Sequence, residues 1–126
     1  MGSESLHEPA ESLRPETVDA HRAVTSLLEE LDAIDWYNQR VDATGDPELA
    51  GILAHNRDEE KEHASMLLEW IRRHDIRLDS VLRRYLFTTD PILEIEKTAG
   101  EPVRPSAVPA SAGSLGIGAL KDKEPL

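Results

Sequence analysis

The chain has 126 residues, no cysteine and a formal net charge of -11 at pH 7. This length allows one small domain, and the lack of cysteine excludes disulfides, thiolate metal sites and thiol nucleophiles. The acidic excess lies before residue 101, because residues 101–126 carry three acidic and three basic side chains. Such a surface disfavours nucleic acid, which needs a basic footprint, and it suits cations. With no signal peptide and no apolar run near the roughly 20 residues of a membrane span, we expect a soluble, cytoplasmic protein.

A first long helix is predicted from Leu13 to Val41, after a flexible N-terminus over residues 1–11. Ser12 is a suitable N-cap, and Pro15 suits the first turn of a helix. Within the helix, mostly apolar residues recur at alternating spacings of four and three. This pattern predicts a seam packed lengthwise against other helices, formed by Ala20, Val24, Leu27, Leu31, Ile34, Asn38 and Val41.

A tight break follows, in which Gly45 can end the first helix and Asp46 can cap the next, with Pro47 in its first position. So short a connection makes the second helix, predicted from Pro47 to His74, an antiparallel neighbour of the first. Its seam repeats the spacing but is apolar at both ends and polar in the middle, which is unusual for a core. The seam consists of Leu49, Leu53, Asn56, Glu60, His63, Leu67 and Trp70.

A third helical segment is predicted over Leu78 to Thr88, and Asp90-Pro91 begins another short helical turn. These segments are too short to complete a bundle, and two long helices cannot bury their own seams. The predicted fold is therefore all-α, an antiparallel two-helix hairpin plus a short C-terminal helix over residues 12–97, which dimerises into a four-helix bundle. Residues 98–113 are expected to form a flexible linker because Pro, Ala, Ser and Gly dominate there.

Glu60 and His63 fall on the seam of the second helix, and Glu30 of the first helix shares a face with the mostly apolar residues Ala23, Leu27, Ile34 and Tyr37. Glu60 and His63 share a helical face between Leu53 and Leu67, so a carboxylate and an imidazole could ligate one metal ion. Glu30 lies about as many residues before the turn as Glu60 lies after it, which brings both to the same height. A hydrogen-bonded pair between helices is the alternative explanation, since a carboxylate taken out of water needs a partner.

Ferritin-like di-iron bundles use a Glu from each of two helices and a Glu-x-x-His from each of two others. This chain has one of each, so a two-fold dimer would complete both the bundle and the metal site. Mostly oxygen ligands favour iron over zinc, and two iron ions could pass electrons to dioxygen. Two other functions stay open: a non-catalytic cargo or adaptor whose polar seam fixes dimer register, and an oxygen-carrying or oxygenase bundle, although such carriers are richer in seam histidines.

Other candidate residues lie near this site. Tyr37 could donate a hydrogen bond to a ligand, and Glu29 and Asp32 add negative charge beside Glu30. Asp35 is assigned to a solvated acidic face. The remaining histidines of the helices lack a partner at ligand spacing on the seams, which indicates structural or surface roles for His21, His55 and His74.

The segments 28–37 (LEELDAIDWY) and 55–63 (HNRDEEKEH), together with 85–88 (YLFT), resemble the encapsulated ferritins over roughly residues 7–97. This resemblance implies a ferroxidase with Glu30, Glu60 and His63 as iron ligands and Tyr37 beside them. It also implies dimers that assemble into an open ring. Metal entry and a secondary site, for calcium or another divalent cation, would involve Glu29, Asp32 and Trp36. Asp32 stands where we expect Glu, and its shorter arm leaves the strength of that secondary site open.

The tail over residues 114–126 is similar to the peptide by which such proteins dock inside encapsulin shells. Leu115, Ile117 and Leu120 offer three apolar anchors, while Gly116 and Gly118 let the backbone lie close to a groove. We therefore expect Ser114–Lys121 to bind an encapsulin shell protein and to place the chain in the lumen of a cytoplasmic nanocompartment.

Overall fold

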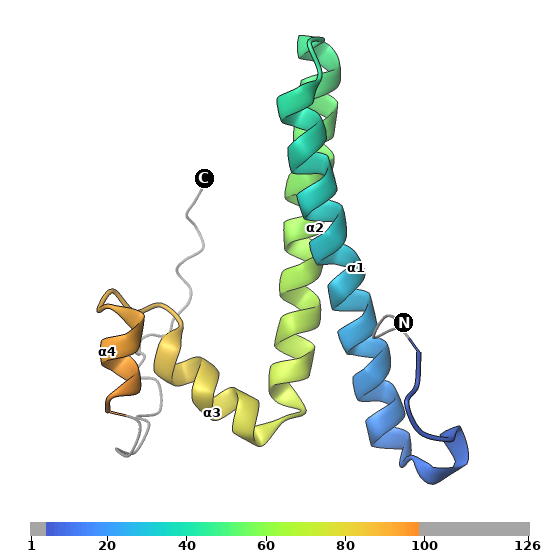
Figure 1. Cartoon of the computed structure of the whole chain (residues 1–126), viewed down its shortest axis with the longest axis vertical. Coiled ribbons are helices and arrows are strands. Elements are labelled where there is room, and N and C mark those ends of the chain that lie inside the picture. Colours follow the sequence, from blue (N-terminus) through green and yellow to red (C-terminus); the bar gives the residue numbers. More distant parts are fainter. Residues whose placement is uncertain (1–4, 99–126) are drawn as a thin grey trace, which may run out of the picture. The chain divides into compact units, whose positions relative to one another are not determined.

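The computed structural model of the chain describes residues 5–98, which fold into helices joined by short turns and contain no β-strand (Figure 1). The predicted all-α fold is confirmed. Within the described residues, those up to His74 form one compact unit and those from Asp75 form another. Within residues 5–98, no helix combines the length and apolar composition that crossing a membrane requires.

The first unit begins with a single 3-10 turn, Ala10–Ser12, before the long helix α1, Pro15–Ala43. The prediction that Ser12 caps α1 is wrong, because Ser12 still belongs to the 3-10 turn. Arg14 occupies the N-cap position in an extended conformation and makes no side-chain cap. The residue before a proline is pushed toward extended backbone, so Pro15 decides where α1 starts.

A three-residue break separates α1 from α2, Pro47–Arg73, and the two helices pack side by side as an antiparallel hairpin (Figure 1). The Asp46 side chain accepts hydrogen bonds from the backbone N–H groups of Glu48 and Leu49, at 3.0 and 3.5 Å. Asp46 is thus the predicted cap, and Pro47 opens the helix as expected. This turn sets which residues of α1 and α2 stand at the same height.

The hairpin buries very little on its own. Among residues 5–98, only Ala23 of α1 and Ala64 of α2 are buried, and each is still 8% exposed. Large apolar side chains along both helices remain exposed by more than a third, namely Val24, Leu28, Leu31, Trp36, Leu49, Ile52, Met66 and Trp70. A single hairpin therefore lacks a core of its own and presents apolar surface of the kind that marks an interaction site.

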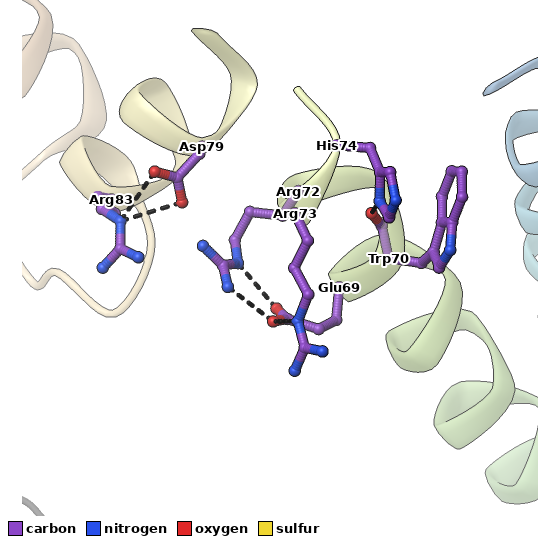
Figure 2. A network of polar contacts seen from close by, with 7 residues as sticks. All are labelled: Glu69, Trp70, Arg72, Arg73, His74, Asp79 and Arg83. Carbon is purple, nitrogen blue, oxygen red and sulfur yellow. Dashed lines mark hydrogen bonds and ion pairs between the residues drawn. The ribbon is translucent and has the colours of Figure 1, made fainter. Parts of the chain in front are cut away.

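The last turn of α2 is closed by a group of side-chain contacts (Figure 2). Both oxygens of Glu69 accept hydrogen bonds from Arg72, at 2.8 and 2.7 Å, and one also accepts from Arg73 at 2.7 Å. His74 stacks on Trp70, with ring centroids 3.8 Å apart, and its Nδ1 donates to the Trp70 carbonyl at 2.8 Å. These contacts use carbonyls and charges at the C-terminal end of the helix, where cations are favourable.

The two arginines lower the pKa of Glu69 to about 2, chiefly through the hydrogen bonds from Arg72 and then Arg73. A depressed carboxyl pKa stabilises the fold above the ordinary value near 4.5, and this contribution is lost as pH falls toward 2. We expect Glu69→Gln to lower stability at pH 7 by no more than about 1 kcal/mol, because solvent screens exposed ion pairs. The difference from wild type should shrink between pH 4.5 and 2 in thermal unfolding followed by circular dichroism. Glu62→Gln, at an exposed position of the same helix, is the matched control, and an equal pH dependence in both variants would contradict this account.

The second unit contains α3, Ile76–Tyr85, and the short helix α4, Ile92–Glu96. The predicted range of Leu78 to Thr88 was wrong at both ends of α3, whereas the short turn after Asp90-Pro91 is present. The Asp75 side chain accepts from the Leu78 N–H at 2.8 Å and so caps α3 earlier than expected. Within α3, Asp79 pairs with Arg83 at 3.0 Å (Figure 2).

Candidate metal centre

The structure brings together Glu30 of α1 with Glu60 and His63 of α2, one potential ligand atom of each lying within 4.8 Å of the others. His63 Nδ1 lies 3.0 Å from Glu60 Oε1 and 3.6 Å from Glu30 Oε1. Glu60 and His63 share a face because they are three residues apart on one helix. Glu30 meets them because the short turn at Gly45 places it at the same height on the antiparallel neighbour.

Hydrogen bonds within the cluster shift the pKa values of its three members. The pKa of Glu30 is raised, chiefly because its carboxyl donates a hydrogen bond to the Glu60 carboxylate and also because burial penalises its charge. The pKa of Glu60 is lowered by accepting that bond, and the pKa of His63 is raised, chiefly by its hydrogen bond to Glu60. A cation that takes these oxygen and nitrogen atoms as ligands competes with protons for them.

The cluster is open on one side. The side chains of Glu30 and Glu60 are each 25% exposed, and that of His63 is 45% exposed. Two carboxylates and one imidazole are suitable ligands for a first-row transition metal, but they are too few to hold two ions. Further ligands could approach through the exposed side.

The remaining predicted site residues are not part of this cluster in a single chain. Arg40 lies over the ring of Tyr37, with its guanidinium carbon 5.3 Å from the ring centroid. Glu29 and Asp32 are exposed on α1, and Trp36 is 52% exposed. The roles assigned to these four residues stay predictions, as do the ligand roles of the three clustered residues.

The residues assigned to the surface have simple local contacts. Asp35 accepts a hydrogen bond from Gln39 at 3.1 Å, one turn along α1. His55 lies 3.4 Å from Glu59, where both side chains are more than half exposed. His21 is 3.5 Å from the Thr25 hydroxyl, and His74 closes the end of α2.

One contact between the helices was missed by sequence reasoning. Arg57 Nη1 donates to Asn38 Oδ1 at 3.1 Å, across the hairpin and a short way toward the turn from the cluster. Asn38 stood out as the polar member of its seam. Arg57 lies off the α2 seam, so counting helical spacings could not pair the two.

Comparison with known proteins identifies relatives along most of the chain. Residues 5–89 match the family model described as EncFtn-like. An encapsulated ferritin-like protein of Rhodospirillum rubrum is 57% identical, covering 100% of this chain and 94% of its own. A ferritin-like protein of Thermotoga maritima is 52% identical over 75% of this chain and 83% of its own. A crystal structure of a protein from Nitrosomonas europaea, 62% identical, matches with a TM-score of 0.68 over 70% of this chain and 97% of that one.

Proposed function

This chain belongs to the EncFtn-like family, and from that premise we propose that it is a ferroxidase that oxidises Fe(II) to Fe(III) with dioxygen and supplies iron for mineral storage. The observation that carries the proposal is the cluster of Glu30, Glu60 and His63 on two antiparallel helices. A ferritin-like name does not by itself specify a reaction, whereas two carboxylates and an imidazole within reach of one ion suit ferrous iron.

In this proposal one chain carries half of the site. Di-iron bundles of this class take one Glu from each of two helices and a Glu-x-x-His from each of two others, and each chain has one of each. A two-fold axis through the exposed side of the cluster would join two halves into one site for two iron ions. The exposed apolar side chains of both long helices support this dimer, because association would complete a four-helix bundle and bury them.

The clustered residues would bind and orient the substrate. Carboxylates from two chains could bridge two ferrous ions, while each His63 binds one of them. The two ferrous ions of one site would each give up one electron, and dioxygen would take up these two electrons with two protons from water, which reduces it to the level of hydrogen peroxide. Tyr37 would hydrogen-bond near the ligands, and Glu29, Asp32 and Trp36 would form an entry route or a secondary site for calcium or another divalent cation. Their position on an acidic helix face supports a role in gathering cations.

The relatives and the tail support a proposed place of action. The Rhodospirillum rubrum relative is described as encapsulated. In this chain residues 114–126 lie outside the described residues, as does nearly all of the predicted linker, so the tail enters only through its sequence. We propose that Ser114–Lys121 docks the protein inside an encapsulin shell, and that the dimers form a ring-like assembly in that lumen.

Anaerobic titration with ferrous iron tests the split site. The metal-free protein is expected to bind about one ferrous ion per chain, and binding should shift the chain toward a dimer, because a ligand that binds only the assembled state stabilises it. Sedimentation velocity gives the assembly state, and admission of air should produce ferric iron at a rate proportional to the protein. A stable dimer that binds no iron would instead favour the non-catalytic adaptor.

A further inference from the structure

Arg57 forms a diagonal connection between the two long helices. It lies three residues before Glu60, about 4.5 Å along α2 at 1.5 Å per residue, while its partner Asn38 lies about 12 Å from Glu30 along α1. Since Glu30 and Glu60 stand at one height, the Arg57 side chain must slant toward the turn to reach Asn38 at 3.1 Å. A slanted connection of this kind changes length when one helix slides along the other.

The guanidinium is also held from the α2 side. Arg57 Nε donates to Asp58 Oδ1 at 3.1 Å, and Asp58 in turn pairs with Lys61 at 3.4 Å. The Arg57 side chain is only 22% exposed. The planar guanidinium donates one hydrogen bond to a residue of each helix. This gives it a fixed direction that an ammonium group could not reproduce.

Packing alone specifies the register of this hairpin weakly. The buried side chains among residues 5–98 are those of Ala23 and Ala64, which offer shallow ridges and grooves. A slip by one helical turn moves a residue about 5.4 Å. Such a slip exceeds the 3.6 Å that separates His63 from Glu30, so it would take the cluster apart.

We propose that Arg57 is a positioning residue that, through Asn38, maintains away from the turn the axial register of α1 against α2 that the turn sets, and thereby holds Glu30 level with Glu60 and His63. Its kinetic consequence rests on the proposed ferroxidase function. Its structural consequence does not, and the two are measured separately.

The kinetic test uses Arg57→Ala and Asn38→Ala, each expected to lower kcat for ferrous oxidation about 10- to 100-fold, because misplacing reacting groups by about an ångström has effects of this size. KM should change little, since the ligands themselves are retained. Asn38→Asp keeps an acceptor for the guanidinium and should restore kcat to near the wild-type value. The matched control is Arg22→Ala, because Arg22 pairs with Asp19 on its own helix at 2.8 Å and is expected to leave kcat unchanged.

The structural test measures register in the metal-free protein. The chain has no cysteine, so spin labels attached through Asp42→Cys and Glu62→Cys report one distance along the hairpin once labelled chains are diluted with unlabelled ones. Adding Arg57→Ala or Asn38→Ala should broaden this distance or shift it by up to about 5 Å, one helical turn, and adding Arg22→Ala should not. Unchanged distances in both helix-bridging variants would overturn the proposal. If the wild type fails to oxidise iron, the ferroxidase function is lost, and the distances alone still decide whether Arg57 sets the register.

Discussion

Replacing Glu60 or His63 by alanine is expected to abolish rapid ferrous oxidation while both long helices still form. Losing merely a hydrogen-bonding partner of a metal ligand costs roughly 10- to 100-fold in metal affinity or activity, so losing a ligand should cost at least about 100-fold. In a symmetric dimer each substitution also removes two ligands from one site. Initial rates of ferric product formation in air, followed by absorbance, measure the effect.

Glu62→Ala is the matched control for this experiment, because Glu62 is an exposed carboxylate on the same helix between the two ligands. It should oxidise iron at the wild-type rate. Helix content, measured by circular dichroism, should be the same in all three variants, since the substitutions lie on partly exposed positions and alanine favours helix. Wild-type rates in both Glu60→Ala and His63→Ala would show that the cluster is not the site of oxidation.

The fold could be read from the sequence where one local rule dominated. The alternating spacing of four and three predicted two long helices, and Asp46-Pro47 fixed the start of the second at the observed residue. Because a three-residue break leaves only one way for the helices to run, their antiparallel pairing followed as well. The equal heights of Glu30 and Glu60 were a consequence of this pairing.

The predicted helix boundaries were wrong where two local signals competed or where a stop signal was missing. Ser12 and Arg14 both precede Pro15, but Ser12 is part of the 3-10 turn. The N-cap position of α1 is therefore occupied by Arg14, although serine is the better capping residue. In the second unit, α3 ends at Tyr85. The next residue, Leu86, is extended, and Phe87 adopts a positive φ of 63°. A bulky residue rarely takes this conformation, which glycine or asparagine would have signalled, so the sequence contained no usable stop.

The candidate site was predictable only as far as helical spacing reaches. Spacing locates Cβ atoms on a face, and this was sufficient for Glu30, Glu60 and His63, which meet directly. Helical spacing does not predict the contacts that long side chains make. Arg57 reaches Asn38 along a diagonal, and Arg40 folds back over Tyr37, so these contacts depend on side-chain direction and not on register alone.

The apolar surface gives the strongest physical reason to expect a partner. The hairpin leaves Leu31, Ile52 and Met66 at least 48% exposed, while its buried residues within residues 5–98 are two alanines. In a dimer both long helices of each chain are used to complete one bundle. An open ring of such dimers, as the family resemblance implies, would enclose no cavity in which a mineral could be kept from water.

Iron storage by this protein is therefore expected to require a shell. Purified protein given excess ferrous iron in air should oxidise it and then let the ferric product precipitate. When the chain is co-expressed with an encapsulin-type shell protein, soluble iron-rich particles should form, because the tail would hold the enzyme against the inner wall. A variant lacking residues 114–126 is the matched control. It should oxidise iron at the wild-type rate, since the tail lies beyond the predicted linker, and should be absent from purified shells.

Electron microscopy and sedimentation distinguish the outcomes. We expect the isolated protein to give a precipitate. Uniform dense cores should form only inside shells that contain the full-length chain, since a ferric mineral stays soluble only when a protein surface encloses it. Uniform soluble cores formed by the isolated protein would show that its own assembly encloses the mineral, and the division between an oxidising enzyme and a storing shell would be wrong. Shells that still contain the truncated chain would place the docking segment before residue 114. Because rate, solubility and co-purification are measured on the same two proteins, a failure of docking is not mistaken for a failure of oxidation.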